Sequence, residues 1–294
     1  MLKQLIIILA NRAATPKKIS MEKKLRQLNE QGLPILQYEV SDLLWKEPDE
    51  YKEEIQTHSL GETLWITDTS AVAAKICEMG GYCIAYLHSE NQNQDFSMIG
   101  YAFEDFKQLD KDYFIKIYQR FRGEAWHILS TRRCEIRESR VADVDAFYEI
   151  YAEPSITYYM ENLYEDKEEE KEYIQTYIDK VYTFLGFGMW TVVDRRSAKI
   201  IGRAGFSLRE GYDEPELGFV IDKRYQRQGY AYEVCNALIN YAKKELEFRQ
   251  IRAIVHQDNE ISQRLCSKLG FKVAGETFLD GAMHKVFIKK LKNS

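Results

Sequence analysis

Short apolar runs alternate with amphipathic segments through the first 130 residues of the chain. The apolar runs are bounded by glycine, proline or polar residues, which is typical of strands. The predicted strands are Leu5–Leu9, Pro34–Tyr38, Leu64–Thr67, Tyr82–Leu87 and Met98–Ala102. The predicted helices are Met21–Glu30, Ala71–Met79 and Asp110–Phe121. Strands that alternate with helices favour parallel pairing, so a Rossmann-like, doubly wound α/β sheet is expected here.

Helix boundaries in this first part are predicted from side chains that satisfy free backbone groups. Ser20 is placed to cap the helix Met21–Glu30, and Gly32 follows the end of that helix. Asp68 is expected to cap the helix that follows it rather than to act in catalysis. The polar segment Ser89–Ser97 is expected to be a loop.

The pattern changes after a break near Gly123–Arg133. The polar turn Asp194–Ala198 between two β-rich runs predicts a hairpin. The predicted strands are Cys134–Arg137, Met189–Val193, Ile200–Phe206, Glu216–Ile221, Ile251–Val255, Phe271–Ala274 and Lys285–Lys289. The predicted helices are Asp143–Tyr151, Glu165–Tyr182, Tyr230–Leu246 and Ile261–Leu269. Two domains are therefore expected, residues 1–130 and 134–294, the second with a mixed α+β sheet.

Composition is that of a globular protein and excludes several other classes. Hydrophobic residues make up 45% and charged residues 30%, and no apolar run is long enough to span a bilayer. The five cysteines are scattered and lack metal-ligand spacing, so we expect reduced thiols, a cytoplasmic protein and no metal. The formal charge of −5 argues against nucleic acid as a partner and suits a cationic one.

The segment Gln226–Ala231 has the pattern Q-x-x-G-x-A and joins a predicted strand to a predicted helix. A helix that begins after such a turn leaves backbone N–H groups unpaired, and its dipole places positive charge at the same point. That combination binds phosphate groups. Gly229 permits close approach of the anion because it has no Cβ. The alternative is an ordinary helix start that contains a glycine.

A second pattern follows in the segment NEISQRLCSKLGF, which contains Asn259, Ser262, Leu265, Gly270 and Phe271. In this order and at this spacing, the two patterns resemble those of the GNAT-type N-acetyltransferases, which transfer acetyl from acetyl-CoA to an amine. The resemblance extends from about Cys134 to the C-terminus. It includes the order of the predicted helices and strands.

The resemblance implies a site for acetyl-CoA, as cosubstrate, and no metal. In this superfamily the strand before the glycine loop splays from the strand after it, and the pantetheine arm lies in the gap. The implied CoA-binding residues are Phe219, Val220, Ile221, Gln226, Arg227, Gln228, Gly229, Tyr230, Ala231, Asn259 and Ser262. For Asn259 the alternative is a helix cap or turn residue, and Ser262 is small enough to allow close approach of the cofactor.

Transfer to an amine requires a neutral nucleophile, so a base or a water relay must accept a proton. Glu216 is the candidate base because related enzymes often carry an acidic residue at the start of this strand. The alternative is a surface glutamate at a strand end. Many relatives place a tyrosine, as general acid, where this chain has Cys266. The absence of tyrosine there is similar to the ribosomal-protein N-terminal and spermidine acetyltransferases, and a buried structural thiol is favoured for Cys266.

The predicted function is acetyl transfer to a primary amine, either of a small molecule or of a peptide N-terminus. A second hypothesis is a non-catalytic sensor that binds acyl-CoA. His256 and His284 could meet the acetyl site, although structural or surface roles are favoured for both. Tyr158, Tyr159 and Tyr164 lie where relatives form part of the acceptor wall. The pattern does not identify the acceptor or the oligomeric state.

Part of the first domain, Gly81 to Asp110, weakly resembles haloacid-dehalogenase-like phosphatase domains. That family requires an Asp-x-Asp nucleophile after its first strand. Here the first strand is followed by Ala10, Asn11, Arg12 and Ala13. The first domain is therefore expected to be a degenerate, non-hydrolytic relative, or a Rossmann-like domain of another kind.

Overall fold

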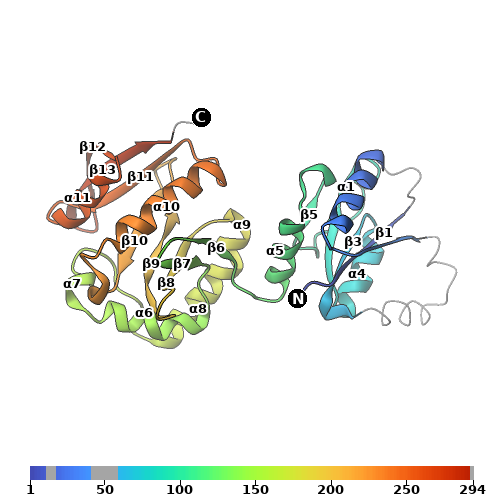
Figure 1. Ribbon diagram of the computed structural model, residues 1–294, viewed down its shortest axis with the longest axis horizontal. Helices are drawn as coiled ribbons and strands as arrows, with labels where there is room; N and C mark the ends of the chain where they lie inside the picture. Colours follow the sequence, from blue (N-terminus) through green and yellow to red (C-terminus); the bar gives the residue numbers. More distant parts are fainter. Residues whose placement is uncertain (11–17, 41–58, 292–294) are drawn as a thin grey trace. The chain divides into compact units, whose positions relative to one another are not determined.

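Figure 1 shows the computed structural model of the chain, which describes residues 1–10, 18–40 and 59–291. The chain forms two compact units, Met1–Glu124 and Ala125–Ser294. Each unit has its own sheet and its own core. The first unit ends within the segment Gly123–Arg133, where the sequence pattern changes.

The first unit contains a parallel sheet with the strand order β2-β1-β3-β4-β5. Its strands are β1 (Gln4–Leu9), β2 (Ile35–Glu39), β3 (Thr63–Thr67), β4 (Tyr82–Tyr86) and β5 (Ala102–Phe103). Helices α1 (Lys18–Glu30) and α5 (Lys111–Phe121) pack on one face, and α4 (Ser70–Glu78) packs on the other. Short 3₁₀ turns lie at Leu60–Glu62 and Phe106–Gln108. This is the doubly wound arrangement that the sequence predicts.

Two details of the first unit differ from the predictions. Ser20 lies inside α1, which begins at Lys18, so Ser20 does not cap this helix. The fifth strand is only Ala102–Phe103, because Met98 is exposed and Ile99 belongs to a turn closed by its N–H to the Phe96 carbonyl. In both cases the sequence predicts the correct type of element, a helix or a strand, but places its boundary at the wrong residue.

The second unit is built on an eight-stranded sheet with the order β12-β13-β11-β10-β9-β8-β7-β6. Its strands are β6 (His127–Ser130), β7 (Cys134–Arg137), β8 (Met189–Asp194), β9 (Ile200–Ser207), β10 (Glu216–Ile221), β11 (Gln250–His256), β12 (Lys272–Leu279) and β13 (Ala282–Lys290). Neighbouring strands are antiparallel except β10 and β11, which are parallel. β6 was not predicted, because its short sequence is polar at both ends.

Helices cover both faces of this sheet (Figure 1). They are α6 (Val144–Tyr151), α7 (Pro154–Thr157), α8 (Lys167–Thr176), α9 (Thr183–Leu185), α10 (Tyr230–Lys244) and α11 (Glu260–Lys268), with 3₁₀ turns at Val141–Asp143 and Lys223–Tyr225. The main core packs α10, through Val234 and Leu238, against Trp190, Phe206 and Leu217 of the sheet.

The predicted helix Glu165–Tyr182 is divided into different segments. Asp166 accepts a hydrogen bond from the Glu168 N–H at 2.7 Å, so the α-helix begins at Lys167. After Thr176 the backbone becomes a π-helix over Tyr177–Tyr182. Such segments are rare and are held by tertiary contacts, here by the Tyr177 hydroxyl, which accepts the Met189 N–H at 2.9 Å.

Candidate active site

Strands β10 and β11 separate almost as soon as they pair. One register pair, Glu216 with Arg252, joins them within the described residues, whereas β10 pairs with β9 along its whole length. The hydrogen bond from the Arg252 N–H to the Pro215 carbonyl, 2.9 Å long, lies at the same end. Beyond it, the edge of β10 that carries the backbone groups of Phe219 and Ile221 has no strand partner in the described residues and faces a gap. Backbone groups at such an edge can bond an extended, amide-containing molecule.

The glycine loop follows β10 and has two residues in left-handed backbone conformations. Arg227 has φ 56°, and Gly229, the N-cap residue of α10, has φ 82°. Within the described part of the chain, the consecutive N–H groups from Arg227 to Tyr232 have no protein acceptor. Successive N–H groups of this kind form an anion-binding nest, and the start of the 15-residue helix α10 adds its dipole.

The two glutamine side chains of the loop bond to the protein itself. The Gln226 amide donates to the Ile221 carbonyl at 2.9 Å, and the Gln228 amide donates to the Arg224 carbonyl at 2.8 Å. These bonds fix the loop shape. The Gln226 N–H also donates to the protein, to the Lys223 carbonyl at 3.3 Å, whereas the Gln228 N–H belongs to the unpaired group and can bind phosphate.

Arg133 lies beside the loop and was not predicted as a site residue. Its Nη1 donates to the Gln228 carbonyl at 2.9 Å, its Nε pairs with Glu233 at 2.7 Å, and its guanidinium lies 4.0 Å from the centre of the Tyr230 ring. Burial opposes ionisation of Glu233, but hydrogen bonds from Thr131 and Arg133 hold the pKa of Glu233 below its usual value. Because Arg133 is far away in sequence, no local pattern could have identified it.

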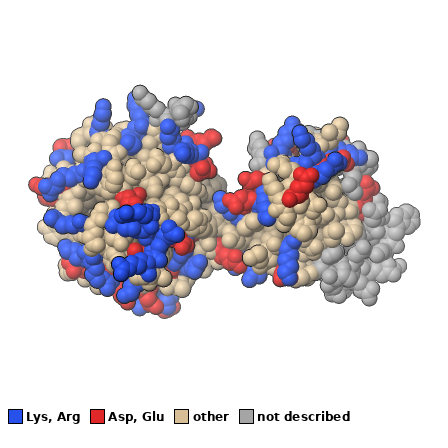
Figure 2. Space-filling model, in the orientation of Figure 1, with Lys and Arg blue, Asp and Glu red and all other residues tan. Residues whose placement is uncertain are grey.

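Figure 2 shows several Lys and Arg side chains gathered near the middle of the visible face of the second unit. Positive charge is therefore concentrated there, although the chain as a whole carries a formal charge of −5. Local positive charge of this kind attracts an anionic ligand from solution.

Asn259 and Ser262 lie at the start of α11, beyond the end of β11. The Asn259 Oδ1 accepts the Ser262 N–H at 3.1 Å, so Asn259 caps this helix, as the alternative interpretation expected. The carboxyl ends of two parallel strands meet at one edge of a sheet. Asn259 and the glycine loop therefore follow β11 and β10 at the same edge, where the gap opens.

Glu216 lies at the opposite end of β10 from the loop. The strand is six residues long, so Glu216 is about 17 Å from Ile221 along it. Its Oε2 accepts a hydrogen bond from the Arg209 Nε at 2.9 Å, and this bond raises the pKa of Arg209. A molecule that reached from the loop to Glu216 would have to extend along β10.

A second ion pair lies next to Glu216. Arg252, the register partner of Glu216, is almost fully buried and pairs with Glu214. The Tyr212 ring covers its guanidinium at 3.8 Å, and burial lowers the pKa of Arg252. Tyr212 in turn bonds Thr277 of β12 at 3.1 Å. These contacts hold the β9–β10 loop against β11 and β12 at the end of β10 where the gap begins.

Cys266 and the two histidines are placed differently. Cys266 is fully buried, and burial raises the pKa of its thiol to about 12, which fits a structural role. The rings of His256 and His284 lie 5.2 Å apart on paired strands, and the Tyr159 ring lies 5.0 Å from His256. Tyr159 also donates to the Asp258 carbonyl at 3.2 Å. Tyr158 and Tyr164 are exposed.

Comparison with known proteins identifies the second unit. Residues 133–272 match the acetyltransferase (GNAT) domain. The chain is 31% identical over 151 residues to the uncharacterized N-acetyltransferase YoaA of Bacillus subtilis, a match that covers 50% of this chain and 84% of that protein. The chain belongs to the GNAT acetyltransferase family. Membership makes it an acetyltransferase, and GNAT acetyltransferases use acetyl-CoA.

Other GNAT relatives agree with this assignment. The uncharacterized N-acetyltransferase YnaD of Bacillus subtilis is 28% identical over 148 residues, covering 50% of this chain and 84% of that protein. The apo structure of RimL, a ribosomal L7/L12 alpha-N-protein acetyltransferase, covers 57% of this chain and 95% of that chain, with a TM-score of 0.50 and 16% identity. At that identity the likeness shows the GNAT fold alone.

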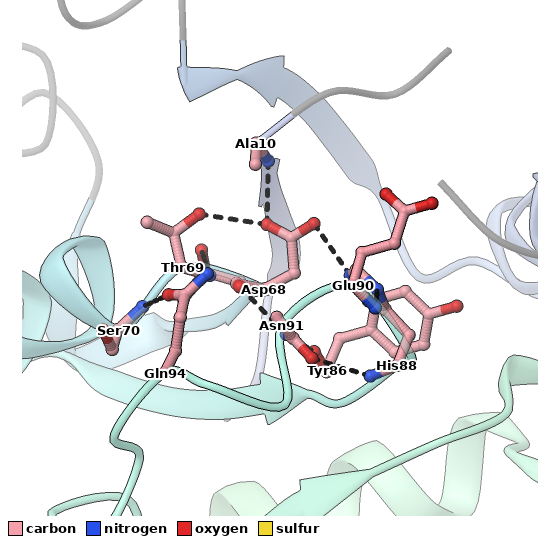
Figure 3. Close-up of polar contacts among 10 residues, drawn as sticks. Ala10, Asp68, Thr69, Ser70, Tyr86, His88, Glu90, Asn91 and Gln94 are labelled. Carbon is pink, nitrogen blue, oxygen red and sulfur yellow. Dashed lines mark hydrogen bonds and ion pairs between the residues drawn. The ribbon is translucent and has the colours of Figure 1, made fainter. Parts of the chain in front are cut away.

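The first unit holds a separate polar cluster at the carboxyl ends of β1, β3 and β4 (Figure 3). The Asp68 Oδ1 accepts the Ala10 N–H at 2.7 Å and the Thr69 hydroxyl at 3.1 Å. Its Oδ2 lies 3.2 Å from the His88 Nε2. The Glu90 N–H donates to the His88 Nδ1 at 3.3 Å, so the His88 Nε2 carries the hydrogen that faces Asp68.

Asp68 therefore does not cap α4, contrary to the prediction. The Gln94 side chain accepts the Ser70 N–H at 2.7 Å instead, because the loop after β4 folds back onto the start of this helix. Asn91, in the same loop, donates to the carbonyls of Asp68 and Tyr86 at 3.0 and 2.9 Å. The segment that was predicted only as a loop thus closes the cluster. Asn11, Arg12 and Ala13 lie outside the described residues.

Two further findings apply to the described residues alone. No helix among them is long and apolar enough to cross a membrane. No three His, Cys, Asp or Glu side chains in this part of the chain come together in a group that could hold a metal ion.

Proposed function

We propose that the second unit transfers acetyl from acetyl-CoA to the primary amine of a small molecule or a peptide N-terminus. The observation that carries this proposal is the early separation of β10 from β11 beside a loop with consecutive unpaired N–H groups. In this arrangement the pyrophosphate binds at Arg227–Ala231. The pantetheine arm extends along β10 in the gap, where the backbone of Phe219 to Ile221 bonds it.

The reaction proceeds by direct attack of the amine on the thioester carbonyl. The nitrogen forms a bond to the carbonyl carbon, and the carbon–sulfur bond then breaks to release CoA. N–H groups of β10 that face the gap stabilise the charge that develops on the carbonyl oxygen. The neutral amine loses one proton and the departing thiolate gains one, so this step releases none; a cationic acceptor first gives up a further proton, which the overall reaction releases.

Glu216 receives the proton of the amine or holds the amine in place. Its contact with Arg209 sets a condition on this role, because a cationic acceptor must share the carboxylate with the guanidinium or displace it. Arg209 belongs to the exposed β9–β10 loop and can move without disturbing the core. Because Cys266 is buried, protonation of the thiolate falls to solvent or to the proton released by the amine.

We further propose that residues 1–130 are a Rossmann-like accessory domain, either a degenerate haloacid-dehalogenase relative or a domain of another kind, and that residues 134–294 are the acetyltransferase domain. The parallel sheet of the first unit and its cluster of polar side chains at the strand ends support this proposal. The free thiols of the five cysteines support a cytoplasmic location.

A screen tests the proposed function directly. The full chain is incubated with acetyl-CoA and a panel of amines and N-terminal peptides, and free thiol is measured. Amine-dependent release of thiol is expected, and mass spectrometry should find the acetyl group on the amine. A chain that binds acetyl-CoA but releases no thiol with any acceptor would instead be an acyl-CoA sensor.

A further inference from the structure

Arg203 differs from the other buried arginines of the chain. Within the described residues, three arginines are buried: Arg137, Arg203 and Arg252. Arg137 bonds both carboxylate oxygens of Asp143, at 2.7 and 2.8 Å, and Arg252 pairs with Glu214. Arg203 is only 8% exposed and has no carboxylate within ion-pair distance among the described residues; its Nε has no hydrogen-bond partner there, which is also true of the Arg252 Nε.

The surroundings of Arg203 are aromatic. Its guanidinium lies 4.7 Å from the centre of the Phe147 ring, and the Tyr151 hydroxyl interacts with it. Burial raises the pKa of Tyr151, Tyr173 and Tyr177, while the positive charge of Arg203 acts in the opposite direction. These hydroxyls are therefore protonated and can donate hydrogen bonds. A cation–π contact contributes about 1–2 kcal/mol, less than the cost of several kcal/mol for burying an unpaired charge.

The nearby negative charge does not compensate Arg203. Glu170 of α8 is buried, and its negative charge raises the pKa of Tyr151 and Tyr173, whereas the positive charge of Arg203 lowers it. However, its Oε2 accepts the Tyr164 N–H at 3.2 Å, and no ion pair joins it to Arg203 in the described structure. The guanidinium thus has no paired carboxylate among the described residues, although the buried Glu170, whose Oε1 also lacks a partner, acts on the same tyrosines.

The position of Arg203 connects it with the proposed acetyl site. Arg203 of β9 is the register partner of Val220 of β10, and Gly205 is that of Gly218. Because side chains alternate between the two faces of a sheet, the Arg203 side chain lies on the same face as Glu216. The Arg203 Cα is about 8 Å from that of Gly218, two residues along and one strand across. The Met189 side chain lies over Gly218, and Tyr177 bonds the Met189 N–H, so these residues line the intervening surface.

We propose that Arg203, with the hydroxyls of Tyr151 and Tyr177, binds a carboxylate of the acceptor. The inference rests on the proposed function, and it narrows the acceptor to an amine that carries a carboxylate several bonds away. A short acidic peptide with a free N-terminus has this chemistry. A polyamine does not, because its second charge would be repelled by the unpaired guanidinium.

Kinetics with matched acceptors test this subsite. Alanyl-glutamate amide, with a free side-chain carboxylate, is compared with alanyl-glutamine amide and with spermidine. In the wild type the acidic dipeptide should have the lowest KM. Arg203→Gln should raise its KM by about 10- to 100-fold, the effect of losing hydrogen bonds to a charged group, and leave the KM of the glutamine dipeptide unchanged. For Arg203→Lys, the KM of the acidic dipeptide should lie between those of the wild type and Arg203→Gln.

Glu170→Gln is the matched control, since it removes a buried charge of opposite sign from the same tyrosine cluster. It should not raise the KM of the acidic dipeptide. An equal rise in the KM of the acidic dipeptide in Glu170→Gln and Arg203→Gln would overturn the proposal. A lower KM of the wild type for spermidine than for the acidic dipeptide would also overturn it. Stability gives a further test, because removing an uncompensated charge should leave the Tm of Arg203→Met unchanged or raised, whereas a structural arginine would lower it.

Failure of the proposed function gives a different result. If no acceptor releases thiol, titration calorimetry of glutarate against the complex with CoA still measures the subsite. Binding by the wild type that is lost in Arg203→Gln supports the carboxylate site. Absence of binding by the wild type contradicts it.

Discussion

Glu216 is the residue on which proton removal depends in the proposed reaction. It is nearly buried, begins β10, and shares its carboxylate with Arg209 at 2.9 Å. The sequence could identify this glutamate by its position before the glycine loop. It could not reveal the guanidinium, because a contact between a loop and a strand depends on how the β9–β10 loop folds back.

Replacing Glu216 by Gln retains the shape of the side chain and removes its charge. If Glu216 is the base, kcat should fall by about 10²-fold, while calorimetry should show nearly unchanged affinity for acetyl-CoA. Glu210→Gln, in the exposed part of the same loop, should retain the wild-type rate. A Glu216→Gln variant with the wild-type rate at every pH would remove Glu216 from the mechanism.

Cys266 should make stability depend on pH in alkaline solution. Burial raises the pKa of this thiol from 9.0 to about 12 in the folded chain. Above pH 9 the unfolded thiol is ionised while the folded one keeps its proton, so its contribution is complete below pH 9 and is lost as the pH rises toward 12. Urea denaturation should show a shallower loss of unfolding free energy between pH 9 and 11 in Cys266→Ala than in the wild type. An equal loss of unfolding free energy in the two proteins would contradict the burial of the Cys266 thiol.

At the scale of elements, strands were predicted better than the ends of helices. β10 and β11 are evident from β-branched and aromatic runs, and the parallel sheet of the first unit from its alternation with helices. The change from α8 to the π-helix Tyr177–Tyr182 depends on the bond from the Met189 N–H to Tyr177, which no local pattern encodes. The separation of β10 from β11 was implied by the family resemblance alone.

The Asn259→Ala variant tests whether one side chain both caps helix α11 and binds the cofactor. Asn259→Ala removes the helix cap and should lower the free energy of unfolding by about 1 kcal/mol. If its amide also bonds pantetheine, the affinity for acetyl-CoA should fall as well. Asp166→Ala removes the comparable cap of α8 and should cost similar stability without loss of affinity. Equal acetyl-CoA affinity in the two variants would restrict Asn259 to capping.

At the scale of the whole molecule, the two units differ in how far the sequence predicts function. In the second unit, two motifs at the right spacing predict the fold, the cosubstrate and the edge of the sheet where it binds. Arg133 and the proposed subsite residue Arg203 were not predicted, because their contacts are with residues distant in sequence. In the first unit the fold was predicted, but Asp68 was assigned the wrong partners because Ala10, His88 and Gln94 meet only in the folded chain.

The first unit should not hydrolyse phosphate esters. Both oxygens of Asp68 already have protein partners, and the paired aspartates of phosphatases are absent after the first strand. The full chain should release no phosphate from a broad ester panel with magnesium. Metal-dependent turnover that Asp68→Asn abolishes would show that this cluster is catalytic.

Binding of acetyl-CoA at the glycine loop tests the central claim most directly. Gly229 has φ 82°, and a Cβ there would lie 3.5 Å from the Arg133 Nη2, so Gly229→Glu brings bulk and negative charge to the proposed pyrophosphate site. Gly281→Glu is the matched control, since Gly281 has φ 79° with open space around it. Calorimetry should show acetyl-CoA binding largely abolished in Gly229→Glu and retained in Gly281→Glu, with both variants folded. Unchanged affinity in Gly229→Glu would contradict a cosubstrate site at this loop.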